Sequence, residues 1–231
     1  MNIPRNAPIG IIDSGIGGLS LLKNLVRKYA YENYIYLADN LNMPYGNKSA
    51  KFLRERILEL VNYLCDTFNV KLVILACNTA SLTSLEYVTK HSKVKVIGLD
   101  VGSLVTVNTK IVCTKRSSTF YPNLNVCACS SLASNIEENI FDIKTLKRKI
   151  SNIISKINEK DIILGCTHYE LVENLFRQVD QTKNYILPCK EFVNQLILDK
   201  PNLSNRKGDI LMISTLATKS YIDKLWKIFK S

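Results

Sequence analysis

The sequence predicts an α/β fold built on parallel β-sheets. Short apolar runs rich in Val, Ile and Leu alternate with longer amphipathic stretches along most of the chain, as expected for buried parallel strands connected by helices. One form of this pattern occurs twice, at 72–81 and 161–170, as an apolar run, a small residue and a cysteine with polar neighbours. Cys77 and Cys166 are therefore each expected at the carboxyl end of a strand.

The first part of the chain predicts four strands and two long helices. A glycine-rich turn after Asp13 separates the first strand from its helix, and Pro44-Tyr45-Gly46 predicts a turn after the second strand. The apolar residues of the second helix fall on one face, which indicates that this face packs in the core. The chain is expected to pass from one domain to the next at 99–103, which marks a domain boundary. The expected strands are 9–12, 34–39, 72–75 and 94–98, and the expected helices are 19–29 and 51–68.

The second part continues the alternation of strands and helices. The hydroxyl-rich segment 115–119 is expected to be a loop, and the polar segment 201–208 a link. Trp226 falls on the apolar side of the closing helix. The expected strands are 110–114, 125–129, 161–164, 184–187 and 209–214, and the expected helices are 132–139, 143–158, 191–198 and 219–230.

Composition favours a globular, cytoplasmic protein. With 46% hydrophobic residues, 9 Gly and 6 Pro, the chain can build a core and shows no disordered bias. Its beginning has no basic segment followed by a long apolar one, and no apolar run approaches the ~20 residues that span a bilayer. The odd number of cysteines, 7, favours a reducing compartment with free thiols.

Charge and cysteine spacing argue against two other classes of function. A net charge of +11 is compatible with nucleic-acid binding or with an acidic small substrate. The lysines are scattered, and the dense patch 144–149 falls on what reads as the solvated face of a helix, so nucleic acid is not favoured. Cys127-Ala128-Cys129 has neither the spacing of a redox motif nor a matching pair for zinc, and no metal site is predicted.

The chemistry is expected to reside in the two cysteines at strand ends. Helix amides that begin there favour thiolate over thiol. The other five cysteines are assigned to packing. Two thiols suit a reaction that needs a base on each side of one carbon, such as inversion of an α-carbon without a cofactor. Asp13 and His168 are candidates to prepare the thiols for proton transfer, although Asp13 could instead be a helix N-cap.

The motifs resemble those of the glutamate racemases, within the aspartate/glutamate racemase superfamily. The matching segments cover most of the chain and are Asp13-Ser14-Gly15-Ile16-Gly17-Gly18, Ala38-Asp39 with Pro44-Tyr45-Gly46, Ala76-Cys77-Asn78-Thr79-Ala80-Ser81 and Gly165-Cys166-Thr167-His168-Tyr169.

The resemblance implies a role for each matching residue. Cys77 and Cys166 would be the two catalytic acid/bases, with Asp13 assisting the first and His168 assisting the second. Glu137 would act with His168, although its neighbour Glu138 is an alternative. The residues implied to hold the substrate are Asp13, Ser14, Tyr45, Gly46, Asn78, Thr79, Thr114, Ser117, Thr167 and His168.

The resemblance also implies an architecture and a biological role. It implies two similar α/β domains related by a pseudo-twofold, with the active site in the cleft between them. The first domain would comprise 1–98 and be completed by 208–231, and the second would comprise 99–207. The enzyme would interconvert L- and D-glutamate without cofactor or metal, supply D-glutamate for peptidoglycan, and form a homodimer. The alternatives are a racemase of the same superfamily acting on aspartate or another amino acid, and a catalytically impaired relative that only binds an amino acid.

Overall fold

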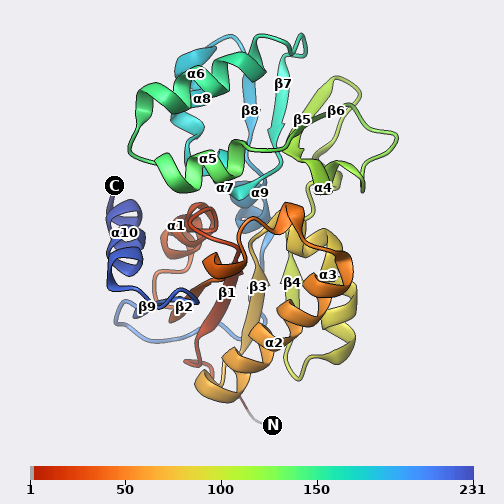
Figure 1. Ribbon diagram of the computed structural model, residues 1–231. Coiled ribbons are helices and arrows are strands. Elements are labelled where there is room, and N and C mark those ends of the chain that lie inside the picture. The colour runs from red at the N-terminus through yellow and green to blue at the C-terminus, as the bar shows by residue number, and fades with distance from the viewer. Residues whose placement is uncertain (1–2) are drawn as a thin grey trace.

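The computed structural model describes residues 3–231 and contains two parallel β-sheets (Figure 1). The strand order is β4-β3-β1-β2-β9 in the first sheet and β6-β5-β7-β8 in the second. Every strand pair is parallel. The strands are β1 (Ile9–Asp13), β2 (Tyr34–Ala38), β3 (Leu72–Leu75), β4 (Val96–Gly98), β5 (Thr109–Thr114), β6 (Val126–Cys129), β7 (Asp161–Leu164), β8 (Asn184–Ile186) and β9 (Ile210–Ser214).

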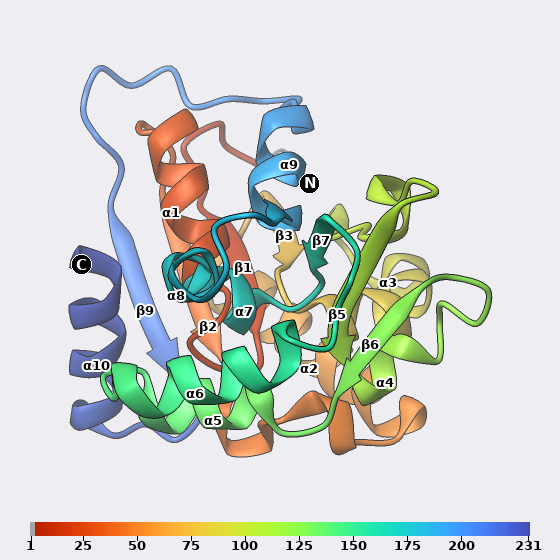
Figure 2. The same ribbon diagram turned by 90° about the horizontal axis from the view of Figure 1, so that it is seen from above.

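The two sheets share one strand order, which confirms the predicted fold class. Read from β2, the first sheet runs β2-β1-β3-β4, and the second runs β6-β5-β7-β8. The strand ends after β3 and β7, which carry Cys77 and Cys166, are therefore equivalent positions. β9 pairs with β2 and returns the chain to the first sheet (Figure 2). We propose 98/99 and 207/208 as the domain boundaries, because the strands change sheet across both.

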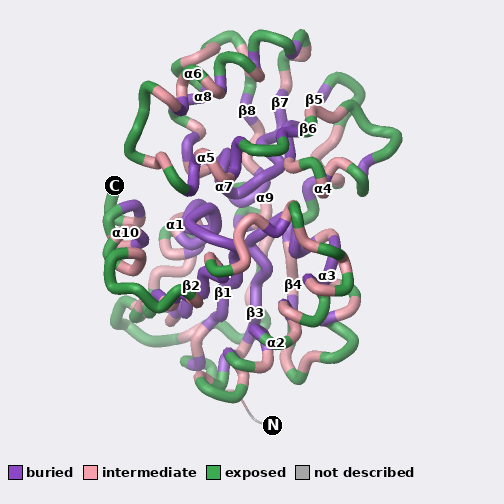
Figure 3. The backbone as a smooth tube through the Cα atoms, viewed as in Figure 1, coloured by how far each residue is buried: buried purple, intermediate pink, exposed green. Residues whose placement is uncertain are grey.

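Helices cover the sheets and fill the space between them. The largest apolar cluster joins β1, β2 and α1 of the first sheet's layer with β7, α5, α6, α7, α8, α9 and α10, and Figure 3 shows buried residues concentrated in this central region. No helix in residues 3–231 is long and apolar enough to cross a membrane. The helices are α1 (Leu19–Lys28), α2 (Ala50–Phe68), α3 (Asn78–His91), α4 (Lys115–Ser118), α5 (Leu132–Asn139), α6 (Ile143–Ile154), α7 (Thr167–Leu171), α8 (Glu173–Val179), α9 (Pro188–Gln195) and α10 (Lys219–Lys230), with 3-10 turns at Asn40–Asn42, Tyr45–Asn47 and Gly102–Leu104.

Three of the predicted elements differ from the structure in type or by three residues or more at an end. The expected loop at 115–119 is mostly the short helix α4, because the Thr114 hydroxyl accepts a hydrogen bond from the Ser117 amide and caps it. α9 starts at Pro188 rather than at 191, since proline suits the first turn of a helix, and it ends at Gln195 rather than at 198. α6 ends at 154 instead of 158, where the chain tightens into i to i+3 hydrogen bonds from Lys156 and Ile157.

A buried carboxyl of α7 lies at the start of α9. Glu170 Oε1 accepts a hydrogen bond of 2.9 Å from the Cys189 amide, and Ser20 of α1 donates to the Cys189 sulfur at 3.3 Å. Burial raises the pKa of Glu170 to about 8, and this amide hydrogen bond lowers it only in part. The carboxyl is therefore protonated in the folded protein at neutral pH.

Glu170→Gln is expected to increase stability at pH 8 but not at pH 5. The folded protein keeps Glu170 protonated up to about pH 8, whereas the unfolded chain ionises it near 4.5. The wild-type free energy of unfolding therefore loses a contribution on the order of 5 kcal/mol as the pH rises from 4.5 through 8. Glutamine keeps the acceptor for the Cys189 amide and does not titrate.

Urea unfolding at both pH values measures this difference. Glu138→Gln, an exposed carboxyl-to-amide change on α5, is the control and should shift stability little at either pH. An equal effect of Glu170→Gln at pH 5 and pH 8 would show that Glu170 is ionised when buried.

Candidate active site

Both predicted catalytic cysteines line one cavity between the two sheets. Cys77 follows β3 and precedes α3, and Cys166 follows β7 and precedes α7. The cavity has a volume of about 20 Å³, which is room for about one water molecule, so an amino acid enters only if the walls move apart. The other residues of the wall are Ser14, Met43, Pro44, Tyr45, Gly46, Thr79, Thr114, Ala133 and His168.

Asp13 lies behind this wall at the end of β1 and is fully buried. Its Oδ1 accepts from the Gly15 amide at 2.9 Å, and its Oδ2 accepts from the Thr167 hydroxyl at 3.1 Å. Burial raises the pKa of Asp13, and His168 and these two hydrogen bonds offset the rise only in part. Asp13 is not an N-cap, since α1 begins after Gly18 without a side-chain cap.

The predicted acidification of the first thiol is wrong. Burial raises the pKa of Cys77 to about 12, and the nearby Asp13 carboxyl adds to the rise, while hydrogen bonds from Ala80 and Ser14 oppose it. The amides at the start of α3 do not outweigh the removal of the sulfur from water. Cys77 is therefore a thiol in this closed form, and a cation placed beside it would favour thiolate.

His168 forms a buried pair with a carboxylate of α5. Its Nε2 lies 2.8 Å from Glu137 Oε2. Burial disfavours the charged imidazolium, but hydrogen bonds to Cys166 and Glu137 outweigh it and hold the pKa of His168 well above its ordinary value. Burial likewise disfavours the carboxylate, yet the bonds that it accepts hold the pKa of Glu137 below its ordinary value. The pair is thus an imidazolium and a carboxylate, and Cys166 lies against the imidazolium.

Small polar side chains from both domains meet beside the cavity. The hydroxyls of Thr79, Thr114 and Ser117 bond one another at 3.0 to 3.2 Å. The Asn78 amide donates to the Gly165 carbonyl at 3.0 Å and so joins α3 to the chain before Cys166. These groups are suited to bind carboxylate oxygens once the hydrogen bonds between them break.

The turn that carries Tyr45 is held by a buried ion pair. The Tyr45 hydroxyl donates to Asp39 Oδ2 at 2.8 Å. The Arg56 guanidinium binds the same carboxylate in two places, with Nη2 2.8 Å from Oδ1 and Nε 3.1 Å from Oδ2. Sequence reasoning missed Arg56, since one arginine among the polar residues of α2 carries no local signal.

The predicted site residues form two groups around the cavity. Those in its wall are Ser14, Tyr45, Gly46, Cys77, Thr79, Thr114, Cys166 and His168. The others lie outside the wall. Ser117 and Glu137 are hydrogen-bonded to wall residues, and Asp13, Asn78 and Thr167 are next to wall residues in the chain. Within residues 3–231, no three His, Cys, Asp or Glu side chains are grouped as a metal site.

The similarity to a curated relative shows to which family the chain belongs. No protein-family model matches the chain. The glutamate racemase of Buchnera aphidicola subsp. Schizaphis graminum is 34% identical over 210 residues, which cover 80% of this chain and 82% of that protein. The chain belongs to the glutamate racemase family. It is therefore an amino-acid racemase, an isomerase, and the resemblance carried by its motifs is confirmed.

Solved racemase structures share the fold over nearly the whole chain. Glutamate racemase from Thermus thermophilus, in complex with β-chloro-D-alanine, has a TM-score of 0.84 at 24% identity and covers 98% of this chain and 94% of that one. Glutamate racemase from Francisella tularensis subsp. tularensis SCHU S4, in complex with D-glutamate, has a TM-score of 0.77 at 26% identity and covers 99% and 95%.

The last helix of this racemase reaches the site, which the motifs did not indicate. Tyr221 of α10 donates to Glu137 Oε1 at 2.5 Å, and Lys224 donates to the Glu137 carbonyl. The Ile16 amide donates to Glu137 Oε2 at 2.9 Å. Glu137 therefore contacts α7, α10 and the turn after β1, whereas Glu138 is exposed, so Glu137 is the neighbour that faces His168.

Gly17→Ala is expected to disrupt this racemase's site. A Cβ at Gly17 would lie 2.5 Å from both His168 Nδ1 and Thr167 Oγ1 and 2.7 Å from the His168 amide nitrogen. Because backbone cannot yield as a side-chain tip does, α7 must shift and carry His168 with it. We expect a loss of activity of at least about tenfold, since small misplacement of catalytic groups is costly.

Steady-state racemisation assays test the effect of Gly17→Ala. Gly102→Ala is the matched control, because its Cβ would meet neighbours only at 3.4 Å and beyond. Activity of Gly17→Ala equal to that of the control would show that α7 need not keep this position.

Proposed function

We propose that the protein interconverts L- and D-glutamate without a cofactor, with Cys77 and Cys166 as the two bases. The observation that carries the proposal is that equivalent ends of two equivalent strands deliver both sulfurs to one cavity. A substrate between them would present opposite faces of its α-carbon to the two sulfurs. One thiolate removes the α-proton, and the other thiol donates a proton to the opposite face.

The neighbouring charges prepare the two sulfurs differently. The substrate's ammonium group, placed near Cys77, would lower the raised pKa of this thiol, and Asp13 would take up its proton. On the other side, the imidazolium of His168, held by Glu137, lies against Cys166 and would balance the negative charge when this sulfur acts as the base. Each sulfur would therefore have a cation beside it when it removes the α-proton.

The remaining polar residues would hold the substrate. The hydroxyls of Thr79, Thr114 and Ser117 suit a carboxylate, and so do Ser14, Thr167, the Asn78 amide and the backbone of Gly46. Tyr45 lies in the cavity wall with its hydroxyl on Asp39, so it would confine the substrate. Binding these groups would replace the hydroxyl-to-hydroxyl bonds of the closed form.

We place the reaction in the cytoplasm, where its D-glutamate would enter peptidoglycan, and we propose a homodimer. The location rests on the odd number of cysteines, which favours a reducing compartment, and the other two statements follow the family resemblance. Light scattering of the purified protein measures the oligomeric state.

Incubation of L-glutamate and L-aspartate separately in heavy water tests the function. We expect chiral chromatography to show equal amounts of both glutamate enantiomers at equilibrium and little D-aspartate. Early in the reaction, the product should carry deuterium at the α-carbon while unreacted substrate keeps protium, because the incoming hydrogen comes from the second, solvent-exchanged thiol.

Two results would overturn the proposal. Faster conversion of aspartate would identify a racemase of the same superfamily with another substrate. Glutamate binding without deuterium incorporation from either enantiomer would identify a binding protein.

A further inference from the structure

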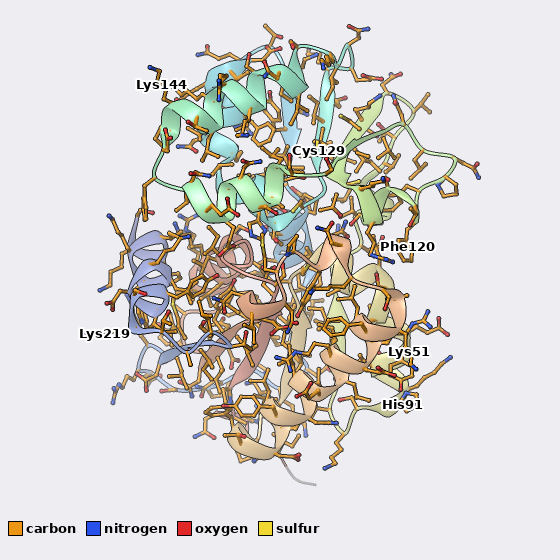
Figure 4. The ribbon with its side chains drawn as sticks, in the orientation of Figure 1. Lys51, His91, Phe120, Cys129, Lys144 and Lys219 are labelled. Carbon is orange, nitrogen blue, oxygen red and sulfur yellow. The ribbon has the colours of Figure 1, made fainter. Side chains whose placement is uncertain are left out.

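A second and much larger cavity lies beside the edge strand of the second sheet. Its volume is about 470 Å³, and its wall comes from β6, the start of α5, and α6. Cys127 and Cys129 lie on β6 in this wall, and Figure 4 labels Cys129 where β6 leads into α5. None of its residues lines the cavity that holds Cys77 and Cys166.

Lysines give this cavity a positive charge. Lys110, Lys149 and Lys156 lie in its wall, and no acidic residue does. Lys110 is partly neutralised by Glu159, whose Oε1 lies 3.6 Å from its Nζ. Lys149 and Lys156 form no ion pair among residues 3–231. Two free ammonium groups therefore face a space large enough for a small peptide or metabolite.

Cys127 is the reactive member of the cysteine pair. Residues two apart on a strand point to the same face, and Cys127 is half-buried whereas Cys129 is buried. The Cys129 thiol, whose Sγ lies 4.0 Å from the Cys127 carbonyl oxygen, lowers the pKa of Cys127, and Lys110 and Lys156 add to this effect against the cost of burial. Cys127 in turn raises the pKa of Cys129. Of the two sulfurs, the more exposed one, nearer the lysines, is therefore the one that ionises first.

We propose that Cys127 is a thiol-modification site that forms a mixed disulfide with small anionic disulfides, which Lys149 and Lys156 attract. The Cys127 thiolate attacks one sulfur of the incoming disulfide. A new S–S bond forms to Cys127, the old S–S bond breaks, and the departing thiolate takes the electron pair and then a proton from water. The incoming disulfide is the oxidant. Cys127 was assigned to packing from sequence, and its exposure and its lysine neighbours are what change that assignment.

The test compares glutathione disulfide, which is anionic, with cystamine, which is cationic, on the full chain. Intact-mass and peptide mass spectrometry follow the adduct at each cysteine, and each rate is divided by that of the same reagent with N-acetylcysteine. We expect glutathione disulfide to modify Cys127 at least about tenfold faster than cystamine on this scale, as for electrostatically attracted ligands. Cys127→Ser should remove the adduct.

Two controls keep the test decisive. Cys65 is also half-buried, but burial and Asp66 raise its pKa, so it should react slowly with both reagents. Lys149→Gln with Lys156→Gln, whose fold is checked by circular dichroism, should bring the ratio of the two rates close to one. Modification of Cys127 no faster than that of Cys65, or a ratio unchanged in the lysine variant, would overturn the proposal.

Discussion

Replacing Cys77 or Cys166 by serine is expected to lower the rate of glutamate racemisation by about 10²- to 10⁴-fold, the usual contribution of a positioned acid or base. A serine hydroxyl keeps the shape of the side chain but is far less acidic than a thiol, so it cannot supply the anion that removes the α-proton. Both directions of the reaction should slow, because each sulfur serves as base in one direction and as acid in the other. Chiral chromatography of the product formed from L-glutamate and from D-glutamate measures the effect in each direction.

Cys65→Ser is the matched control for these variants. Cys65 lies in α2, outside the cavity wall, and is half-buried, so the same chemical change there should leave the rate nearly unchanged. Thermal unfolding must show that all three variants fold. Near-wild-type turnover by a folded Cys77→Ser or Cys166→Ser protein would refute the assignment of two sulfur bases.

Arg56→Met is expected to reduce the free energy of unfolding by about 3 kcal/mol, the lower part of the range for breaking a buried ion pair. The change leaves the fully buried carboxylate of Asp39 with only the hydroxyl of Tyr45 and the amide of Asn42 as partners. The side chain of Arg56 is 18% exposed, so water compensates for part of the loss. Urea unfolding at neutral pH measures it.

The companion variants separate charge from packing. Asp39→Asn removes the carboxylate's charge and should cost less than Arg56→Met, because no unpaired buried anion remains. The double variant should lose less than the sum of the single losses. If the losses in free energy of unfolding were strictly additive, Asp39 and Arg56 would not stabilise the protein as a pair. The position of Tyr45 would then depend on its turn alone.

Strand ends could be predicted from sequence because they depend on local patterns. A four-residue apolar run followed by a cysteine is visible without any contact information, and both cysteines do meet at one cavity. The start of α9 also has a local signal, because a proline such as Pro188 is favoured in the first turn of a helix.

The parts that could not be predicted depend on distant residues and on burial. The contact of Tyr221 with Glu137 joins positions 84 residues apart, and no spacing rule links them. The pKa of Cys77 was predicted in the wrong direction because a helix terminus can be recognised in sequence, whereas the depth at which the sulfur is buried cannot. Arg56 was missed for the same reason, because only the fold shows that Asp39 is buried.

The position of β9 and α10 has a consequence for how the enzyme is made. These elements come last among the described residues as the chain leaves the ribosome, yet they complete the edge of the first sheet and hold Glu137 through Tyr221 and Lys224. The rest of both domains can begin to fold during translation. Glu137 gains its full set of partners only when α10 has emerged, so a nascent polypeptide should lack the complete surroundings of Glu137 until Tyr221 and Lys224 have left the ribosome.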